Sequence, residues 1–222
     1  MEFDQFANNY ENVLDKTIAM SGEDSTYFAQ YKARYLARVM GASFAGSILD
    51  FGCGVGLLSW FLTEHLPKSQ VNGFDVSADS ISKIRPDLIK QGIFTSDEKQ
   101  LRHDYDLIVV ANVMHHIEPA DRERAVKTLA GRLNPRGILA IIEHNPVNPA
   151  TRWVVENCPF DKDVTLLRPT ETRAYVTSAK LSVVRQDYIV FMPSFLAWFR
   201  WVERWLGWLP LGAQYVVMGS KA

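Results

Sequence analysis

One stretch near residue 50 constrains the fold of this chain more than any other. It reads Ile48-Leu49-Asp50-Phe51-Gly52-Cys53-Gly54-Val55-Gly56-Leu57-Leu58. Apolar residues lead to an acid, three glycines follow at alternate positions, and a second apolar run begins. The pattern predicts a buried strand that ends at Asp50, a sharp turn through the glycines and a helix that starts near Val55. A turn of this kind lets the backbone approach a ligand closely, and the N–H groups at the helix start can bind its polar atoms.

The spacing of the glycines separates two nucleotide-binding folds. The dinucleotide fingerprint G-x-G-x-x-G would need a third glycine at Leu57, whereas the third glycine comes one residue earlier, at Gly56. The run resembles instead motif I of the class I S-adenosylmethionine (SAM) methyltransferases, in which an apolar strand precedes Asp or Glu and x-G-x-G-x-G. The resemblance implies that the cofactor-binding residues of this turn are Asp50, Gly52, Cys53, Gly54 and Gly56.

A second acid follows the next predicted strand, Gln70-Val71-Asn72-Gly73-Phe74-Asp75. Asp75 lies 23 residues after Gly52, close to where an α/β nucleotide site places the carboxylate that binds the ribose hydroxyls. An ionised carboxylate offers two acceptor oxygens, which match a vicinal diol. We therefore assign Asp75 to the ribose and Val76 to the same site, the alternative being a surface acid in an ordinary loop.

Two later stretches extend the resemblance. A short strand at residues 92–97 precedes the position whose side chain, in the resembling family, accepts from the adenine amino group, which implies Asp97 with Ser96 beside it. The run Tyr105–Ile117 begins with continuous apolar residues, as in a strand buried on both faces, and resembles motif IV of the family. Asn112 follows that strand and joins the implied cofactor-binding set.

The alternation of strands and helices over residues 47–143 predicts a doubly wound parallel α/β sheet. The resemblance implies the family's fold: a Rossmann-like, mostly parallel sheet of about seven strands with helices on both faces and an antiparallel last strand. A chain of 222 residues suits one such domain. We divide residues 1–222 into an N-terminal helical lid (1–45), a SAM-binding core (46–144) and an acceptor-side region (145–222). The chain is identified as a member of the class I SAM-dependent methyltransferases, of the small-molecule type (methyltransferase domain 11/12-like).

The lid carries two further residues that the resemblance brings to the cofactor. Similar methyltransferases begin with a segment like Phe6–Glu11, followed by a helix such as the one that the apolar stripe at residues 27–40 predicts. By this resemblance Tyr10 and Lys32 approach SAM, with Lys32 facing the methionine carboxylate as a point charge. A solvated position for Lys32 is the alternative.

Candidates for acceptor chemistry follow the fourth and fifth predicted strands. Methyl transfer from a sulfonium needs alignment of the acceptor and, for some acceptors, removal of a proton. His116, Glu143 and His144 stand where the acceptor should approach, and His116 is our first choice of base. Many family members need no dedicated base, and that alternative stays open.

Nucleic acid is disfavoured as the acceptor. The net charge is −1, where nucleic-acid binders usually carry a basic excess. Residues 112–115 read Asn-Val-Met-His in place of the Asn/Asp-Pro-Pro-aromatic motif of nucleic-acid amino-methyltransferases. We therefore expect a small-molecule acceptor. Two alternatives to methyl transfer stay open: a SAM-binding protein with other chemistry, and a non-catalytic partner subunit.

Residues 194–209 form a predicted helix with an unusual composition. Four of the six tryptophans of the chain lie in Trp198–Trp208, and the charges at positions 200, 203 and 204 share one side. Three interpretations stay open: the helix caps the core, it lies in a membrane interface, or it forms a homodimer face or an apolar acceptor pocket. The membrane interpretation implies a lipid-linked or otherwise hydrophobic acceptor.

Composition sets the remaining limits. The two cysteines, Cys53 and Cys158, suggest neither a disulfide framework nor a metal site. The N-terminus lacks a basic segment followed by an apolar one, and no uncharged apolar run reaches the length of a transmembrane helix. We expect a cytoplasmic protein, peripheral to the membrane if the tryptophan-rich helix lies in its interface.

Overall fold

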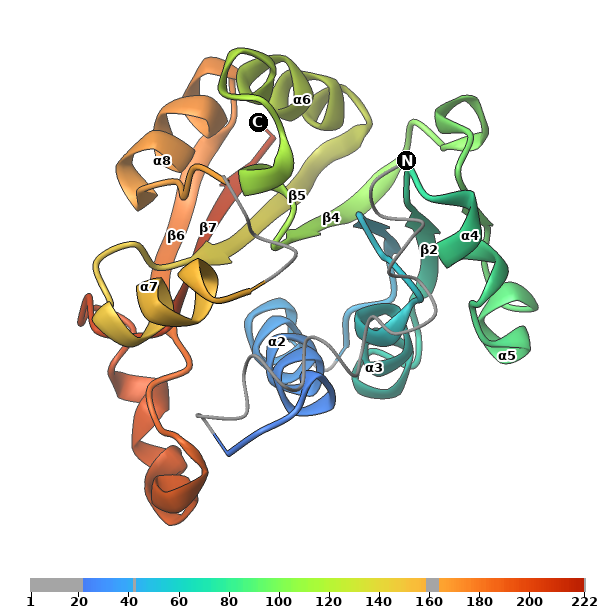
Figure 1. The fold of residues 1–222 in the computed structure, drawn as a ribbon. Helices are drawn as coiled ribbons and strands as arrows, with labels where there is room; N and C mark the ends of the chain where they lie inside the picture. The colour runs from blue at the N-terminus through green and yellow to red at the C-terminus, as the bar shows by residue number, and fades with distance from the viewer. Residues whose placement is uncertain (1–21, 42, 159–163, 222) are drawn as a thin grey trace.

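Seven strands form a single sheet in the order β3-β2-β1-β4-β5-β7-β6 in the computed structural model, which describes residues 22–41, 43–158 and 164–221 (Figure 1). The strands are β1 (Ser47–Phe51), β2 (Gln70–Phe74), β3 (Phe94–Thr95), β4 (Tyr105–Ala111), β5 (Leu133–His144), β6 (Ser182–Ile189) and β7 (Gln214–Ser220). The first five strands pair in parallel, whereas β7 runs antiparallel to both β5 and β6. The predicted fold class, including the antiparallel last strand, is confirmed.

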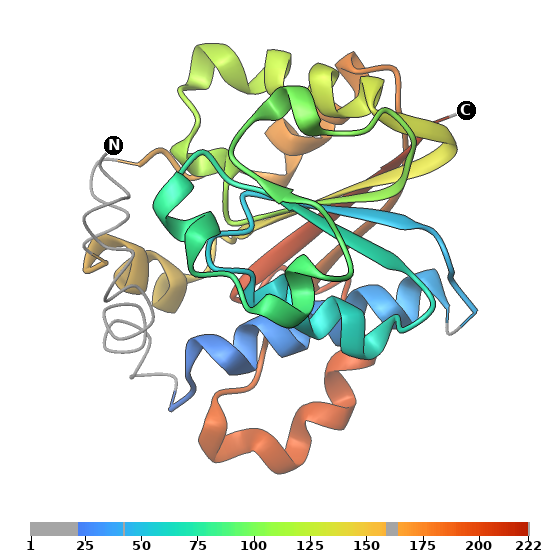
Figure 2. The ribbon, with the colours of Figure 1, turned by 90° about the vertical axis from the view of Figure 1, so that its right-hand side faces the viewer.

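Helices cover both faces of the sheet, as the continuous apolar runs of the central strands require. They are α2 (Ser25–Met40), α3 (Leu57–His65), α4 (Ala78–Ser82), α5 (Pro86–Ile89), α6 (Pro119–Gly131), α7 (Pro149–Glu156) and α8 (Pro169–Ser178). On one face α2 and α3 pack against side chains such as Ile48 and Val109, and on the other α6 and α8 pack against side chains such as Ile108 and Tyr215. Figure 2 shows the sheet between these two layers.

Local sequence signals account for several helix boundaries. The Asp24 carboxylate caps α2 by accepting from the N–H of Tyr27 at 2.8 Å, and the Ser77 hydroxyl caps α4 by accepting from the N–H of Ser80 at 3.1 Å. Pro86 separates α4 from α5, because proline cannot continue the preceding helix. The helix after the glycine turn begins at Leu57 rather than near Val55, since Gly56 adopts a left-handed conformation.

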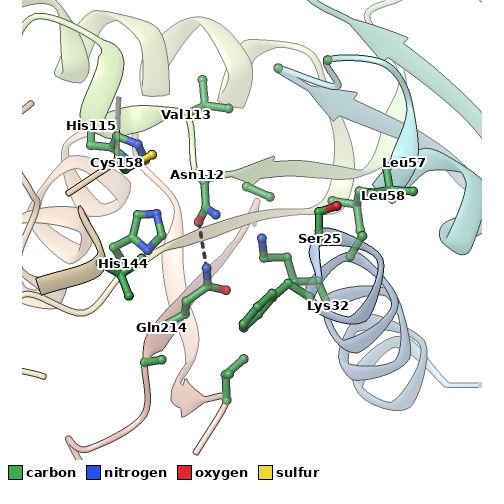
Figure 3. Close-up of a pocket in the computed structure, with 18 of the residues that line it drawn as sticks. Ser25, Lys32, Leu57, Leu58, Asn112, Val113, His115, His144, Cys158 and Gln214 are labelled. Atoms are coloured by element: carbon green, nitrogen blue, oxygen red, sulfur yellow. Dashed lines mark hydrogen bonds between the residues drawn. The ribbon is translucent and has the colours of Figure 1, made fainter. Parts of the chain in front are cut away.

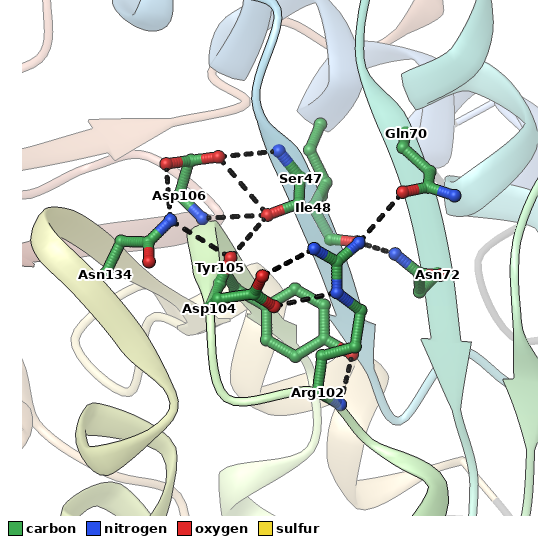
Figure 4. A network of polar contacts seen from close by, with 9 residues as sticks. All are labelled: Ser47, Ile48, Gln70, Asn72, Arg102, Asp104, Tyr105, Asp106 and Asn134. Atoms are coloured by element: carbon green, nitrogen blue, oxygen red, sulfur yellow. Dashed lines mark hydrogen bonds and ion pairs between the residues drawn. The ribbon is translucent and has the colours of Figure 1, made fainter.

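Polar side chains tie the strands together at the amino end of the sheet (Figure 4). The Asp106 carboxylate on β4 accepts from the N–H of Ser47 on β1 at 2.8 Å and from the Asn134 side chain on β5 at 2.9 Å. The Arg102 guanidinium donates to the Asp104 carboxylate at 2.6 and 2.7 Å and to the Gln70 side chain on β2 at 2.9 Å. Four neighbouring strands are therefore linked at this end by groups that bond to one another.

The tryptophan-rich segment does not cap the core, so that interpretation was wrong. A 3₁₀ helix, η6 (Ser194–Trp205), kinks at Leu196 and projects from the body of the molecule below α2 (Figure 2). Trp198 and Trp208 are 71% and 75% exposed, whereas the charged Glu203 is buried. We call residues 193–211 the aromatic arm. No helix among the described residues is long and apolar enough to cross a membrane.

Candidate functional site

A cavity of about 750 Å³ opens at the carboxyl ends of the parallel strands. Its walls come from α2, the glycine turn after β1, the loops after β2 and β4, α7, the start of β7 and residues 190–193 after β6. Figure 3 shows Lys32 entering from α2 on one side and His144 from the end of β5 on the other. The carboxyl end is where parallel α/β sheets bind ligands.

The three glycines of the turn all adopt positive φ, at 79° for Gly52, 53° for Gly54 and 83° for Gly56. A Cβ on Gly52 would stand 2.3 Å from a methyl carbon of Val113, so the turn packs tightly against the loop after β4. A Cβ on Gly54 would meet no atom within 4 Å, and Gly54 lines the cavity. The turn therefore presents bare backbone to the cavity, which only glycine allows at this conformation.

Asp75 is anchored to the glycine turn by backbone groups. One carboxylate oxygen accepts from the N–H of Gly54 at 2.8 Å, and the other accepts from the N–H of Ser77 at 2.9 Å. Each carboxylate oxygen has two acceptor sites, so both can accept a further hydrogen bond from a ligand. Asp75 lines the cavity beside Val76, whose side chain is 52% exposed.

Two buried charges lie behind the turn. Asp50 accepts from the Ser59 hydroxyl at 2.6 Å, and burial raises the pKa of Asp50 to about 6. Lys32 is buried on α2, and this burial lowers the pKa of its ammonium to about 8, although the Glu143 and Asp50 carboxylates favour the charged form. Lys32 and Asp50 line the cavity, so a charged ligand group there would meet charges that water screens little.

Asn112 and Gln214 meet in the wall of the cavity, between His144 and Lys32 (Figure 3). The Gln214 side chain donates to the Asn112 side-chain oxygen at 3.3 Å, while the Gln214 side-chain oxygen is buried and has no hydrogen-bond partner among the described residues. Asn112 has φ 57°, which is uncommon outside glycine. An unpaired buried acceptor and a strained backbone are both typical of a ligand site.

Three histidines gather at the other end of the cavity around a buried carboxylate. One Glu143 oxygen accepts from the N–H groups of Val113 and Met114 at 3.0 and 2.7 Å, and the other lies 2.6 Å from His115 Nδ1. The His115 ring packs against the rings of His116 and His144, with centroids 4.1 and 5.2 Å apart. Burial alone would raise the pKa of Glu143, but His115 and the N–H donors outweigh it and lower the pKa.

Most of the site residues predicted from sequence face one cavity. Those that line it are Lys32, Asp50, Gly52, Cys53, Gly54, Asp75, Val76, Asn112, His116 and His144. Gly56, Ser96, Asp97 and Glu143 are not among the lining residues, and Tyr10 lies outside the described residues. Asp97 is exposed and caps a 3₁₀ turn by accepting from the N–H of Lys99, and Glu143 is fully buried behind His115.

The sequence interpretation missed several lining residues. Gln214 opens the last strand, and residues 191–193 follow β6. A signal existed only for Gln214, a polar residue directly before the apolar run Tyr215–Met218. The others approach the cavity through the tertiary arrangement of the acceptor-side region, which carries no motif.

Comparison with known proteins agrees with this geometry. Residues 49–139 match a family model described as a methyltransferase domain. A solved structure of a SAM-dependent methyltransferase from Archaeoglobus fulgidus superimposes over 96% of this chain and 100% of its own, with a TM-score of 0.70 and 14% identity. Residues 49–139 therefore resemble the methyltransferase domain family, and the chain as a whole has the fold of a SAM-dependent methyltransferase.

The curated relatives of this chain differ in what their names say they act on. A ubiquinone biosynthesis O-methyltransferase from Aeromonas salmonicida is 30% identical over 48% of this chain and 47% of its own length. A ribosomal RNA small subunit methyltransferase C from Vibrio vulnificus is 26% identical over 52% of this chain and 37% of its own length. The match therefore spans less than half of either relative.

Proposed function

We propose that this methyltransferase binds SAM in the cavity at the carboxyl end of its sheet and transfers the methyl group to a small acceptor. One observation carries the proposal: a single cavity joins the glycine turn and Asp75 at one end to the histidines of the β4 and β5 loops at the other. A methyl donor held at the first end would present its reactive group toward the second. Alignment of two reactants in one cavity is the main requirement of a displacement reaction.

The residues at the glycine end suit the parts of SAM. Gly54 leaves space for the ligand to lie on its backbone, and the Asp75 carboxylate, oriented by two N–H groups, suits the ribose hydroxyls. The buried Lys32 ammonium suits the carboxylate of the methionine part, and the unpaired Gln214 oxygen suits its ammonium group. Bound SAM supplies a methyl group on a positively charged sulfur, which an acceptor atom attacks directly.

The adenine would lie against Val76, which lines the cavity and is half exposed. Ser96 and Asp97 remain proposed contacts of the adenine. Neither residue lines the cavity, and the Asp97 carboxylate already accepts from the N–H of Lys99 at 3.0 Å. Gly56 contributes through the turn, where a Cβ would approach Leu88 to 3.2 Å rather than a ligand.

The histidine end supplies a base for an acceptor that must lose a proton. His116 and His144 line the cavity, and we assign proton removal to His116 first. Glu143 is fully buried, so it acts as a positioning residue. It holds His115, and His115 packs against both of the other rings.

A small acceptor is favoured over RNA, although an rRNA methyltransferase is among the relatives. Residues 112–115 lack the proline pair and aromatic residue of the nucleic-acid amino-methyltransferase motif, and the net charge of −1 provides no excess of cations for phosphates. The acceptor end of the cavity is also largely apolar, with Trp153, Phe191 and Met192 among its lining residues.

Calorimetry with SAM, S-adenosylhomocysteine and NAD tests the proposal. Binding of the first two at micromolar concentrations, with no heat from NAD, is the expected result. Binding of NAD alone would favour a dehydrogenase. Absence of binding by all three would favour the non-catalytic interpretation of the fold.

A further inference from the structure

The aromatic arm exposes a continuous set of apolar side chains. Its exposed residues are Phe195, Ala197, Trp198, Phe199, Trp201, Arg204, Trp205, Trp208, Pro210 and Leu211. Arg204 is the one charged residue in this set, and all of 193–211 is described. A soluble surface rarely leaves so many large apolar side chains together unless they bind something.

Polar contacts on the inner side fix the arm to the body of the protein. The Glu203 carboxylate accepts from the N–H groups of Phe191 and Met192 at 3.3 and 2.8 Å. Arg200 pairs with Glu23 beside α2, and its guanidinium carbon lies 4.2 Å from the centre of the Tyr27 ring. The arm is therefore amphipathic: Arg200 and Glu203 face the body of the protein, and the tryptophans face outward together with Arg204.

We propose that the aromatic arm docks this protein on the surface of an anionic lipid bilayer, so that the cavity receives a lipid-soluble methyl acceptor. The second half of this inference rests on the proposed function. Tryptophan and arginine both suit a membrane interface, where an apolar body can be buried while a polar tip stays hydrated. Arg204 lies over the Trp205 ring at 3.9 Å, and no exposed acid on the arm opposes an anionic surface.

The arm is continuous with the cavity. Phe195 lines the cavity and is 75% exposed, so the same side chain belongs to the arm and to the cavity wall. On the other side, the Asn148 side chain at the start of α7 donates to the carbonyl of Leu211 at 2.6 Å. Trp153 on α7 also lines the cavity and is partly exposed. An acceptor in the bilayer would thus meet an apolar path from the docked arm into the site.

The shape of the arm favours a bilayer over a second copy of the chain. Figure 2 shows the arm as a projection below α2 rather than as a flat face. A protein partner would need a groove to receive it, whereas lipid headgroups and chains adjust around inserted aromatic rings. Self-association through the arm is the outcome of the test that competes with bilayer docking.

Co-sedimentation of the full chain with vesicles tests the proposal. One set of vesicles is phosphatidylcholine alone, and the other also contains phosphatidylglycerol. We expect the wild type to bind the anionic vesicles, Trp201→Ser with Trp208→Ser to weaken binding about tenfold or more, and Arg204→Gln to weaken it about fivefold. The control Ile89→Ser removes an exposed apolar side chain of α5, away from the arm, and should bind as the wild type does.

Two further measurements keep the outcomes separate. Light scattering without vesicles reports the oligomeric state, and calorimetry with SAM reports the nucleotide end of the cavity. Absence of vesicle binding by a wild type that binds SAM would overturn the docking proposal alone. A dimer that the double tryptophan variant converts to a monomer would overturn it in favour of self-association. Vesicle binding without SAM binding would contradict the proposed function and leave the arm as a lipid anchor.

Discussion

The two ends of the sheet are built from similar residue types and differ in what those residues bond to. At the amino end, Asp106 and Arg102 bond to groups on neighbouring strands. At the carboxyl end, the buried Gln214 oxygen has no partner within the described part of the chain, Lys32 is buried with a lowered pKa, and Asn112 has positive φ. Hydrogen bonds between strands stabilise the fold at the amino end, whereas Lys32, Asn112 and Gln214 line a cavity and mark the end that binds a ligand.

The comparison predicts that substitutions at the two ends have opposite consequences. At the carboxyl end, we expect large losses of SAM binding or turnover in the folded protein. At the amino end, we expect a loss of stability while SAM binding by the folded protein is unchanged.

Replacement of His116 by Gln should have the largest effect. If His116 removes the acceptor proton, turnover should fall by a factor of about 100 or more, while the Kd for SAM stays near the wild-type value. Initial rates at saturating SAM measure this change. His144→Gln is the matched variant, because His144 lines the same end of the cavity. A larger loss in that variant would move the base to His144, and full activity in both would mean that no dedicated base is used.

Replacement of Asp75 by Ala should weaken SAM binding by about 100-fold, since two charge-assisted hydrogen bonds to the ribose would be lost. Calorimetry measures the Kd, and urea unfolding provides the matched free energy of unfolding. An affinity within about threefold of the wild type would remove Asp75 from the site.

Replacement of Asp106 by Ala tests the other end of the sheet. The variant leaves the N–H of Ser47 and the Asn134 amide without their acceptor, so the free energy of unfolding should fall by about 2 kcal/mol. The Kd for SAM of the folded variant should be unchanged. If SAM binding weakens as much as in Asp75→Ala, the two ends do not divide stability and function as described.

The pH dependence of SAM binding tests Lys32, with a smaller expected effect. The pKa of Lys32 is lowered to about 8 in the folded protein, so the ammonium that faces the ligand carboxylate is lost as pH rises through that value. Affinity should fall about tenfold between pH 7 and pH 9. Lys32→Met should flatten the dependence of SAM affinity on pH over this range. Any change that remains in this variant comes from other groups, including SAM itself, so the variant is the internal control.

The lowered pKa of Lys32 also predicts how the free energy of unfolding changes with pH. Because the folded pKa lies below the unfolded value of about 10.4, the unfolded chain binds more protons between these two values. The free energy of unfolding should therefore rise from pH 8 to pH 10 in the wild type by more than in Lys32→Met. Equal profiles in the two proteins would place Lys32 in a solvated environment.

The sequence was informative wherever function depends on local backbone. The positive φ of Gly52 and Gly54 follows from the pattern of the turn, and Asp75 follows from its place at a strand end. Ser96 and Asp97 were harder to assign because β3 has two residues and a polar loop follows it. Strand ends without motifs give no local signal for the direction of a side chain.

Residues that reach the site through tertiary packing could not be predicted. Gln214 approaches Asn112 only because β7 inserts antiparallel beside β5. The pattern of residues 194–209 predicted that the charges at 200, 203 and 204 share one side, which was only partly right. Arg200 and Glu203 face the body of the protein, whereas Arg204 is exposed beside the tryptophans. Periodicity specifies which residues share a face and not which partner covers it.

The most direct test of the account is methyl transfer from radiolabelled SAM into an extract of the cells that make the protein, followed by separation into organic and aqueous phases. We predict label in the organic phase with the wild type and none above background with Asp75→Ala. Label in the aqueous phase would keep the methyltransferase activity and contradict the lipid-soluble acceptor. Equal labelling by the wild type and Asp75→Ala would contradict the central claim that the carboxyl-end cavity holds the methyl donor.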